Sequence, residues 1–239
     1  MSVTDRWKQA YPGAMLGAVA LGGVENPKQD AALEGRARDL EADLRSRFLE
    51  PDRSQIAGLP CVRAYADYYK RFGKTYHLIL QLESVTHKNK AISGSGALVQ
   101  AMFMAEMKNL LLTAGHDLGA IQGSLTVELA EGSEEYATLA GTPATLKAGD
   151  MCIRDDQGVI SSIVYGPDQR TRITADTRAV LYAVYAVPGI ALGDLERHLG
   201  DLEANVRIFS PNAVVISREV LLAQSPLNAI RPQAGMAAG

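Results

Sequence analysis

The sequence has few of the residues that carry metal, redox or disulfide chemistry. Its 239 residues include two cysteines, Cys61 and Cys152, and four histidines, and none of them falls in a CxxC, HExxH or similar metal-ligand spacing. We therefore expect no metal, no cofactor and two unpaired cysteines in a reducing compartment. No apolar run approaches the roughly 20 residues of a membrane span. The first residues, MSVTDRWKQAYPG, also lack a signal peptide's apolar stretch. The prediction is a cytoplasmic protein with no membrane partner.

An excess of positive charge is missing as well. Lysine and arginine number 24 against 27 acidic residues, so the formal net charge is −3. Domains that bind nucleic acid strongly are usually basic, so any RNA contact here must depend on a local cluster. The candidate cluster consists of Lys70, Arg71, Lys74, Lys88 and Lys90. Alternatively, these residues form an ordinary solvated rim of the protein surface.

Glycine-rich phosphate loops and nucleophile motifs are absent too. The segment Ser93-Gly94-Ser95-Gly96 lacks the GK[ST] ending of a phosphate-binding loop, and no GxSxG elbow occurs. The simplest interpretation of this segment is the capped start of the helix that follows.

Hydrophobic periodicity predicts helices first and strands afterwards. Helical spacing is present at 28–49 and 61–72, and residues 96–113 form an almost wholly apolar helix that we expect to be buried. From Ser124 to Val187 the period changes to two, which predicts strands joined by turns. A further helix is expected near 192–204.

This order favours an α+β fold over a regular βαβ alternation. We expect a three-layer domain in which the buried helix 97–112 is central and mixed or antiparallel strands from residues 124 to 187 pack around it. The predicted division has three parts: 1–60 as an N-terminal helical extension packed on the core, 61–190 as the core, and 191–239 as a C-terminal helix and strand extension with a frayed tail.

The middle of the chain also carries a recognisable order of motifs. They are ALVQAMFMAEMKNLLL (97–112), TAGHDL (113–118), SLTVELA (124–130), YATLAGTPATLKAGDMCIRDDQGVISSIVYG (136–166) and RTRITADTRAVLYAVYA (170–186). In this order and spacing the segment resembles the B3/B4 module of the bacterial phenylalanyl-tRNA synthetase beta subunit, in its free-standing form.

The resemblance implies a B3/B4-type fold and a tRNA-related function, but not a complete synthetase. In the synthetase the module hydrolyses tyrosine wrongly attached to the phenylalanine tRNA, and an acidic residue on its last strand recognises the tyrosine hydroxyl. Here that position falls near Ala183, which has no polar group. Asn109 falls at or near a pocket asparagine of the module, and His116 lies about three residues from the expected position of a pocket histidine.

Eight polar residues in these segments are candidates for the lining of such a pocket. His116 and Asp117 are the candidate catalytic pair, because a histidine beside a carboxylate can position or deprotonate water. The candidate substrate-binding residues are Lys108, Asn109, Tyr165, Asp168, Arg170 and Arg172.

Each of the eight also has an ordinary structural interpretation. Lys108 suits a solvated helix surface, Asn109 a helix end, and the His116-Asp117 pair the start of a turn. Arg170 and Arg172 suit surface ion pairs.

Three functions remain open at this point. The chain is a deacylase of mischarged aminoacyl-tRNA or a related aminoacyl ester, a non-catalytic module that binds an amino acid, nucleotide or aminoacyl-tRNA end, or a partner-binding protein that docks through the charged helix 28–49. The expected partners are thus aminoacyl-tRNA or a small amino-acid-like ligand. The oligomeric state is left open.

Overall fold

The computed structural model describes residues 1–48 and 53–223. Its elements are, in chain order, β1 (Ser2–Val3), α1 (Asp5–Ala10), β2 (Met15–Gly22), α2 (Ala31–Phe48), α3 (Arg53–Ala57), α4 (Pro60–Arg71), α5 (Leu78–Thr86), α6 (Ala97–Asn109), β3 (Thr113–Asp117), η1 (Leu118–Ala120), β4 (Thr126–Leu129), β5 (Glu135–Ala137), β6 (Pro143–Thr145), β7 (Met151–Asp155), β8 (Gly158–Ser162), β9 (Gly166–Pro167), β10 (Ala179–Ala186), α7 (Leu192–Phe209) and β11 (Val214–Leu222). Helices and strands are both abundant, and the predicted α+β class is confirmed.

The middle layer is an antiparallel sheet of four strands in the order β11-β2-β10-β3. Its inner strands β2 and β10 are buried along almost their whole length. Ala183 lies at the centre of β10, opposite Ala18 of β2 and Ala114 of β3. Three small side chains in a row leave no polar group at this point of the sheet.

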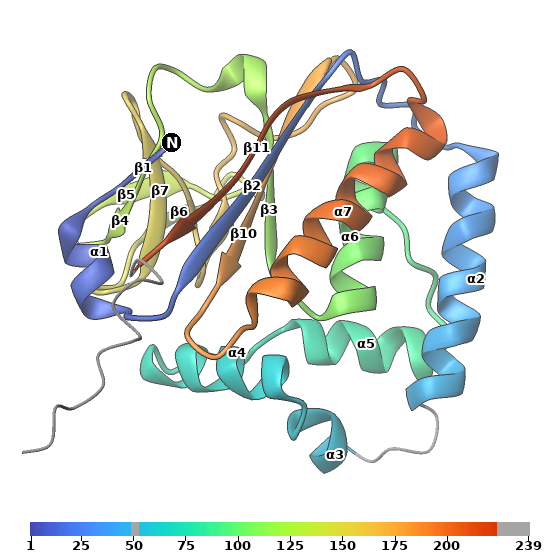
Figure 1. Cartoon of the computed structure of the whole chain (residues 1–239), viewed down its shortest axis with the longest axis horizontal. Helices are drawn as coiled ribbons and strands as arrows, with labels where there is room; N and C mark the ends of the chain where they lie inside the picture. Colours follow the sequence, from blue (N-terminus) through green and yellow to red (C-terminus); the bar gives the residue numbers. More distant parts are fainter. Residues whose placement is uncertain (49–52, 224–239) are drawn as a thin grey trace, which may run out of the picture.

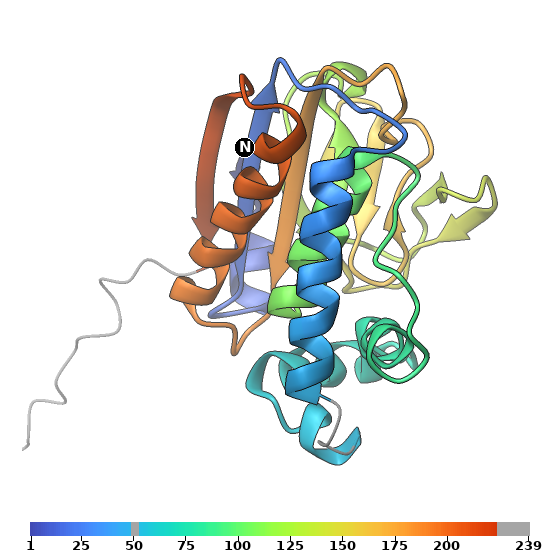
Figure 2. The same ribbon diagram turned by 90° about the vertical axis from the view of Figure 1, so that its right-hand side faces the viewer.

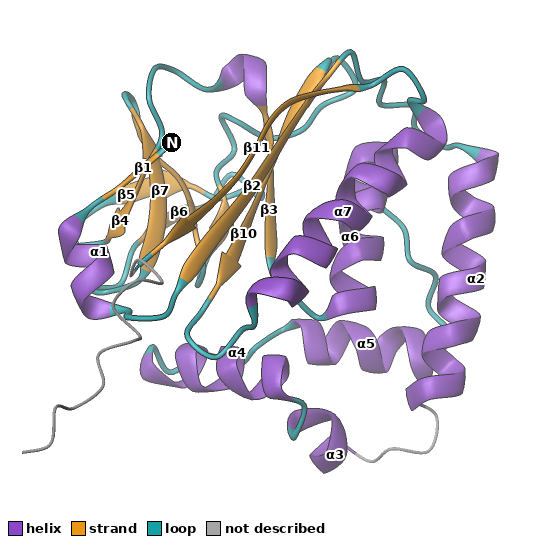
Figure 3. Ribbon diagram, in the orientation of Figure 1, coloured by secondary structure: helices purple, strands orange, loops and turns teal. Residues whose placement is uncertain are grey.

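A second sheet covers one face of the middle layer (Figures 1 and 3). Its strands run in the order β1-β4-β7-β8-β9, and the β1–β4 pair is parallel, so the sheet is mixed. Tyr185 of β10 connects the two sheets, since its hydroxyl lies 2.7 Å from the Ser161 hydroxyl of β8. The short hairpin β5–β6 extends from this layer, as the turned view shows (Figure 2).

Helices cover the other face of the middle sheet (Figures 1 and 2). The buried helix α6 lies against this face, where the Tyr182 hydroxyl of β10 donates to the Leu98 carbonyl at 2.8 Å. Helices α7 and α2 both contact α6. At β2 the fit of α7 is close: a Cβ at Gly17 would lie 2.7 Å from Leu195 Cδ1.

The three layers and the burial of α6 agree with the expectation, but the strands are arranged differently. Strands β4, β7 and β8 form the outer sheet rather than packing around α6. The helix is also shorter than predicted, because Leu110 takes a left-handed conformation (φ 55°) and the chain turns into β3. The residues 113–117 therefore form a strand at the site where the sequence indicated only a turn.

The first sixty residues contribute more than helices to this architecture. Their strand β2 is an inner strand of the middle sheet, and β11 from the C-terminal part pairs with its outer side. The division at residues 60 and 190 stays a prediction, and the expected frayed tail from residue 224 lies outside the described residues. Among the described helices, none is both long and apolar enough to cross a bilayer.

Candidate functional site

His116 lies inside the protein, on the edge strand β3 of the middle sheet. Its side chain is completely buried, and its Nδ1 is 2.7 Å from the Thr171 hydroxyl. That hydroxyl donates its only proton to the Asp168 carboxylate, so Nδ1 of His116 must be the donor to Thr171. The other ring nitrogen, Nε2, is buried and has no hydrogen-bond partner among the described residues.

This environment keeps the imidazole neutral. Burial lowers the pKa of His116 to about 3, and the nearby Arg170 charge acts in the same direction. A neutral ring with Nδ1 protonated holds Thr171, and through Thr171 it holds Asp168. The structure therefore has a hydrogen-bonded chain of three side chains, His116–Thr171–Asp168, in which the histidine is the innermost member.

Asp117 does not join His116. Neighbouring residues of a strand point to opposite faces, and the Asp117 carboxylate accepts from the Thr177 hydroxyl at 2.7 Å and from the Gly119 amide at 2.9 Å. These contacts tie the end of β3 to the loop before β10. The carboxylate and the imidazole thus hold different loops and share no contact.

Asp168, Arg170 and Arg172 line a common cavity of about 350 Å³, which we call the Arg170 cavity. It opens between β5, the β7–β8 turn and the loop after β9. The remaining lining residues are Glu135, Tyr136, Ala137, Gln157, Gly158, Val159 and Gln169. Asp168 is only 4 % exposed. Its carboxylate therefore connects the floor of the cavity to the buried chain that ends at His116.

The two arginines of this cavity have different surroundings. Arg170 donates to Asp155 at 2.8 Å and to the Ala120 carbonyl at 3.1 Å, and its Nε lies 3.7 Å from Asp168. Desolvation opposes ionisation of Asp155, but hydrogen bonds from backbone amides and Arg170 lower its pKa on balance. Arg172 is exposed and, among the described residues, donates only to the Gln169 carbonyl at 2.9 Å. Arg172 is therefore the cation available to a ligand.

Lys108 and Asn109 lie at the end of α6, in a separate group that we call the His198 cluster. Lys108 pairs with Asp201 at 2.7 Å. The Asn109 amide donates to Asp201 at 2.9 Å and lies 3.1 Å from His198 Nδ1, whose Nε2 lies 2.7 Å from the Thr113 hydroxyl. Burial lowers the pKa of His198 to about 3. These contacts fasten α7 to α6, and the two predicted residues do not line the Arg170 cavity.

Glu106 is a buried acid beside the His198 cluster. Its Oε1 accepts from the Thr113 amide at 2.7 Å, and burial raises its pKa to about 8. Sequence reasoning did not select Glu106 or His198 as site residues. Glu106 was visible as a rare acid in an apolar helix, whereas His198 lies 89 residues from its partner Asn109 and gave no signal.

Tyr165 lies in a third place, beside the end of α4. Lys74 lies over the Tyr165 ring at 5.6 Å from its centroid, and Arg71 lies over Tyr11 at 5.0 Å. Two members of the predicted basic cluster thus contact aromatic rings near the end of α4. Lys88 and Lys90 follow α5 instead. The eight predicted site residues are therefore divided among separate locations, and Asp168, Arg170 and Arg172 are the ones that share a cavity.

Comparison with known proteins shows which family the middle of the chain resembles. Residues 99–208, from α6 to α7, match the family model of the B3/4 domain. The phenylalanine–tRNA ligase beta subunit of Tropheryma whipplei (strain Twist) is 30 % identical over 107 residues, which are 44 % of this chain and 11 % of that protein.

A solved structure shows a weaker likeness. It is an N-terminal fragment of the phenylalanyl-tRNA synthetase beta subunit from Pyrococcus horikoshii, with a TM-score of 0.45 and 13 % identity over 92 % of this chain and 49 % of that one. Residues 99–208 are similar to the B3/4 domain, as the resemblance predicted. The chain spans 11 % of the curated relative and 49 % of the solved one.

Proposed function

We propose that this chain is a tRNA-related protein that binds the aminoacyl end of a tRNA in the Arg170 cavity. The observation that carries the proposal is the position of that cavity. Every residue of its lining belongs to the segment 99–208 that matches the B3/4 domain. A curated relative that is 30 % identical over 107 residues is a tRNA ligase subunit by name.

The charges of the cavity suit such a ligand. An aminoacyl-tRNA end offers phosphate anions and, a few bonds away, an α-ammonium group. Arg172 is exposed and has no carboxylate partner among the described residues, so it is free to hold a phosphate. Asp168 and Glu135 line the same cavity and provide carboxylates for the ammonium. Arg170 is held by Asp155 and supplies fixed positive charge behind them.

A second candidate function is hydrolysis of the aminoacyl ester. It is favoured by the chain His116–Thr171–Asp168, which ends at the cavity. The Asp168 carboxylate would accept a proton from a water that attacks the ester carbonyl. It would return this proton to the ribose oxygen as the ester C–O bond breaks, which leaves free amino acid and the ribose hydroxyl. In this scheme His116 acts through Thr171 as a positioning residue, because its ring is buried and neutral.

The basic end of α4 is the candidate contact for the body of the tRNA. Lys74 and Tyr165 present a cation beside a partly exposed ring, an arrangement that favours stacking and phosphate contacts. Neutralising Lys70, Lys74, Lys88 and Lys90 together should weaken tRNA binding and reduce its salt dependence. Binding that is tight and unaffected by this change would put the RNA surface elsewhere. We also keep the expectation of a cytoplasmic protein, since tRNA is charged and used there.

Binding is tested with the full chain and a tRNA that carries its amino acid through a non-hydrolysable amide. We expect Arg172→Ala to weaken binding about tenfold and to lower the slope of log K against log salt by about one. Arg178→Ala is the matched control, because Arg178 is also exposed and bonds only backbone carbonyls, and it does not line the cavity. Equal effects of the two changes, or no binding of any charged or uncharged tRNA, would remove the proposal.

Hydrolysis is tested by a screen of aminoacyl-tRNAs for accelerated deacylation. If one is hydrolysed, Asp168→Asn should slow the reaction by roughly 10²-fold or more, and Thr171→Val should slow it less. A normal rate in Asp168→Asn would exclude this residue as the base. No acceleration with any aminoacyl-tRNA would leave binding as the function of the cavity.

A further inference from the structure

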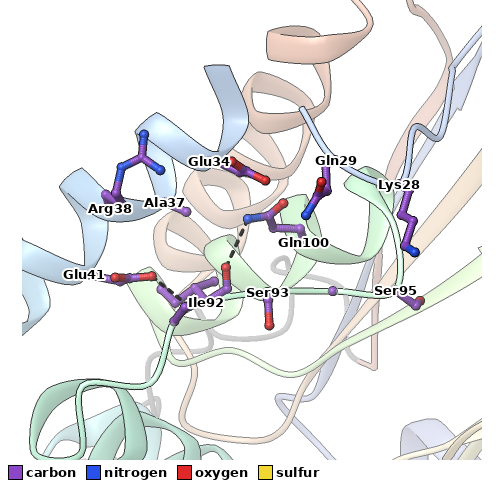
Figure 4. A pocket seen from close by; sticks show the side chains of 12 residues that line it. Lys28, Gln29, Glu34, Ala37, Arg38, Glu41, Ile92, Ser93, Ser95 and Gln100 are labelled. Carbon is purple, nitrogen blue, oxygen red and sulfur yellow. Dashed lines mark hydrogen bonds between the residues drawn. The ribbon is translucent and has the colours of Figure 1, made fainter. Parts of the chain in front are cut away.

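A second cavity, of about 460 Å³, lies outside the Arg170 cavity, between α2 and the loop that precedes α6 (Figure 4). We call it the α2 cavity. One face of α2 forms a wall through Glu34, Ala37, Arg38 and Glu41, which follow helical spacing. The other lining residues are Lys28, Gln29, Ala91, Ile92, Ser93, Gly94, Ser95 and Gln100.

The floor of this cavity is fixed by two polar side chains that hold one residue of the loop. Glu41 accepts from the Ile92 amide at 2.8 Å, and Gln100 donates to the Ile92 carbonyl at 3.0 Å. The loop also passes so close to α6 that a Cβ at Gly94 would lie 2.5 Å from the backbone nitrogen of Gln100. These contacts hold the loop against α2 and α6.

Among the described residues, two charged side chains of α2 that line the cavity have no ion-pair partner, as is also true of Arg36 and Asp39 on another face of the helix. Three acid–base pairs are spaced one turn apart on this helix. Glu41–Arg45 and Asp43–Arg47 both form ion pairs at 3.3 Å. Glu34 and Arg38 have the same spacing, yet within the described part of the chain neither side chain has a partner. Lys28 is likewise unpaired.

Acceptors and donors are separated within the cavity. Gln100 is 8 % exposed and uses its amide nitrogen on Ile92, so its amide oxygen is left for the cavity. In Figure 4 this amide and the Glu34 carboxylate point toward the same space. Glu34 and the Gln100 oxygen together suit an ammonium group. Lys28 and Arg38 border the same space and suit a carboxylate.

We infer that the α2 cavity binds a free α-amino acid. Its ammonium group would lie against Glu34 and the Gln100 oxygen, its carboxylate would meet Lys28 or Arg38, and its side chain would cover the apolar surface of Ala37 and Ile92. An isolated anion would leave Glu34 unpaired, and an isolated amine would leave the two cations unpaired. A zwitterion satisfies both. The volume lies within the range of small-molecule sites.

The test is calorimetric titration of the full chain with single L-amino acids at millimolar concentration. For the amino acid that binds best, the amine without its carboxylate and the 2-oxo acid without its ammonium serve as matched probes. We expect the amino acid to bind at least about tenfold more tightly than either, since each lost charge pair is worth about this factor. Glu34→Gln should weaken binding by about tenfold, and the double variant Lys28→Ala/Arg38→Ala by at least as much.

Asp39→Asn is the control for Glu34→Gln, because it removes the same charge from another face of α2. Arg172→Ala should leave amino-acid binding unchanged, and Glu34→Gln should leave tRNA-end binding unchanged, so the two proposals fail separately. Binding of the 2-oxo acid as tightly as the amino acid, insensitivity to Glu34→Gln, or no saturable binding of any amino acid would each overturn the inference. Glu34 is partly exposed and has no ion-pair partner among the described residues, so its variant should fold normally, which a melting curve checks.

Discussion

Replacing Glu106 with glutamine removes a buried acid while keeping the side chain's shape. The glutamine oxygen can still accept from the Thr113 amide, which lies 2.7 Å from Oε1 in the native protein. Only the ionisable group is lost. The difference in the free energy of unfolding between the two proteins therefore reports how the ionisation of Glu106 affects stability.

The sign and size of the effect follow from the raised pKa of Glu106. Its pKa moves from 4.5 to about 8 on folding. Between these values the folded state holds a proton that the unfolded state has released, so this contribution to stability is complete below pH 4.5 and is lost as the pH rises toward 8. Each pH unit is worth about 1.4 kcal/mol. From pH 5 to pH 7 the native protein thus loses about 2–3 kcal/mol that the Glu106→Gln variant keeps.

Thermal melting at the two pH values measures this difference. For a chain of this size a change of about 2–3 kcal/mol in the free energy of unfolding corresponds to a shift of roughly 4–12 °C in the melting temperature. Between pH 5 and pH 7, the melting temperature of the native protein relative to that of the variant should fall by this amount. The control is Glu196→Gln, an exposed residue of α7 that carries the same charge. If Glu106→Gln shifts the melting temperature by the same amount at both pH values, Glu106 is ionised in the fold and the reasoning is refuted.

Three other predictions use the same melting assay. His116→Gln should make the free energy of unfolding fall less steeply on acidification. Because the pKa of His116 is lowered to about 3, the native protein loses about 1.4 kcal/mol of stability per unit as the pH falls below 6.5. An unchanged dependence of the melting temperature on acid pH would contradict the buried neutral ring. Met104→Asp should cost on the order of 3 kcal/mol or more, since Met104 is 2 % exposed and a carboxylate there would lose its hydration; normal melting would mean that α6 is not buried. Gly17→Ala should cost about 1–3 kcal/mol because its Cβ would meet α7, whereas Gly193→Ala, with open space around it, should not destabilise; equal effects would refute the close packing of α7 on β2.

The sequence predicted those elements whose pattern is local. The apolar run of α6 and the alternation in β4, β7, β8 and β10 were visible without a structure, because burial of one or all faces imposes a period on the chain. Strand β2 was missed, since its small residues MLGAVALG give no alternation when both faces are buried. Strand β3 was missed because only its pairing with β10 makes it a strand.

The candidate site was predictable in composition but not in arrangement. Asp168, Arg170 and Arg172 are neighbours in the sequence, so their common cavity follows from one loop. The separation of His116 from Asp117 follows from the strand β3, which turns adjacent side chains to opposite faces. Asn109 does not line the Arg170 cavity, because the left-handed Leu110 ends α6 directly after it and His198 of α7 contacts its amide. Neither effect has a signature in a short stretch of sequence.

The insertion of β2 between β10 and β11 has a consequence for the order in which the molecule is assembled. Strand β2 is synthesised early, but its partners begin at Ala179 and Val214. Until both have emerged from the ribosome, β2 has both edges unpaired, and such edges are templates for wrong pairing. Contacts between segments so distant in the sequence also make folding slow. Newly made chains should therefore be far more prone to aggregation than the finished protein. For the same reason, a fragment cut at the borders of the matched segment, 99–208, would expose β10 along one edge.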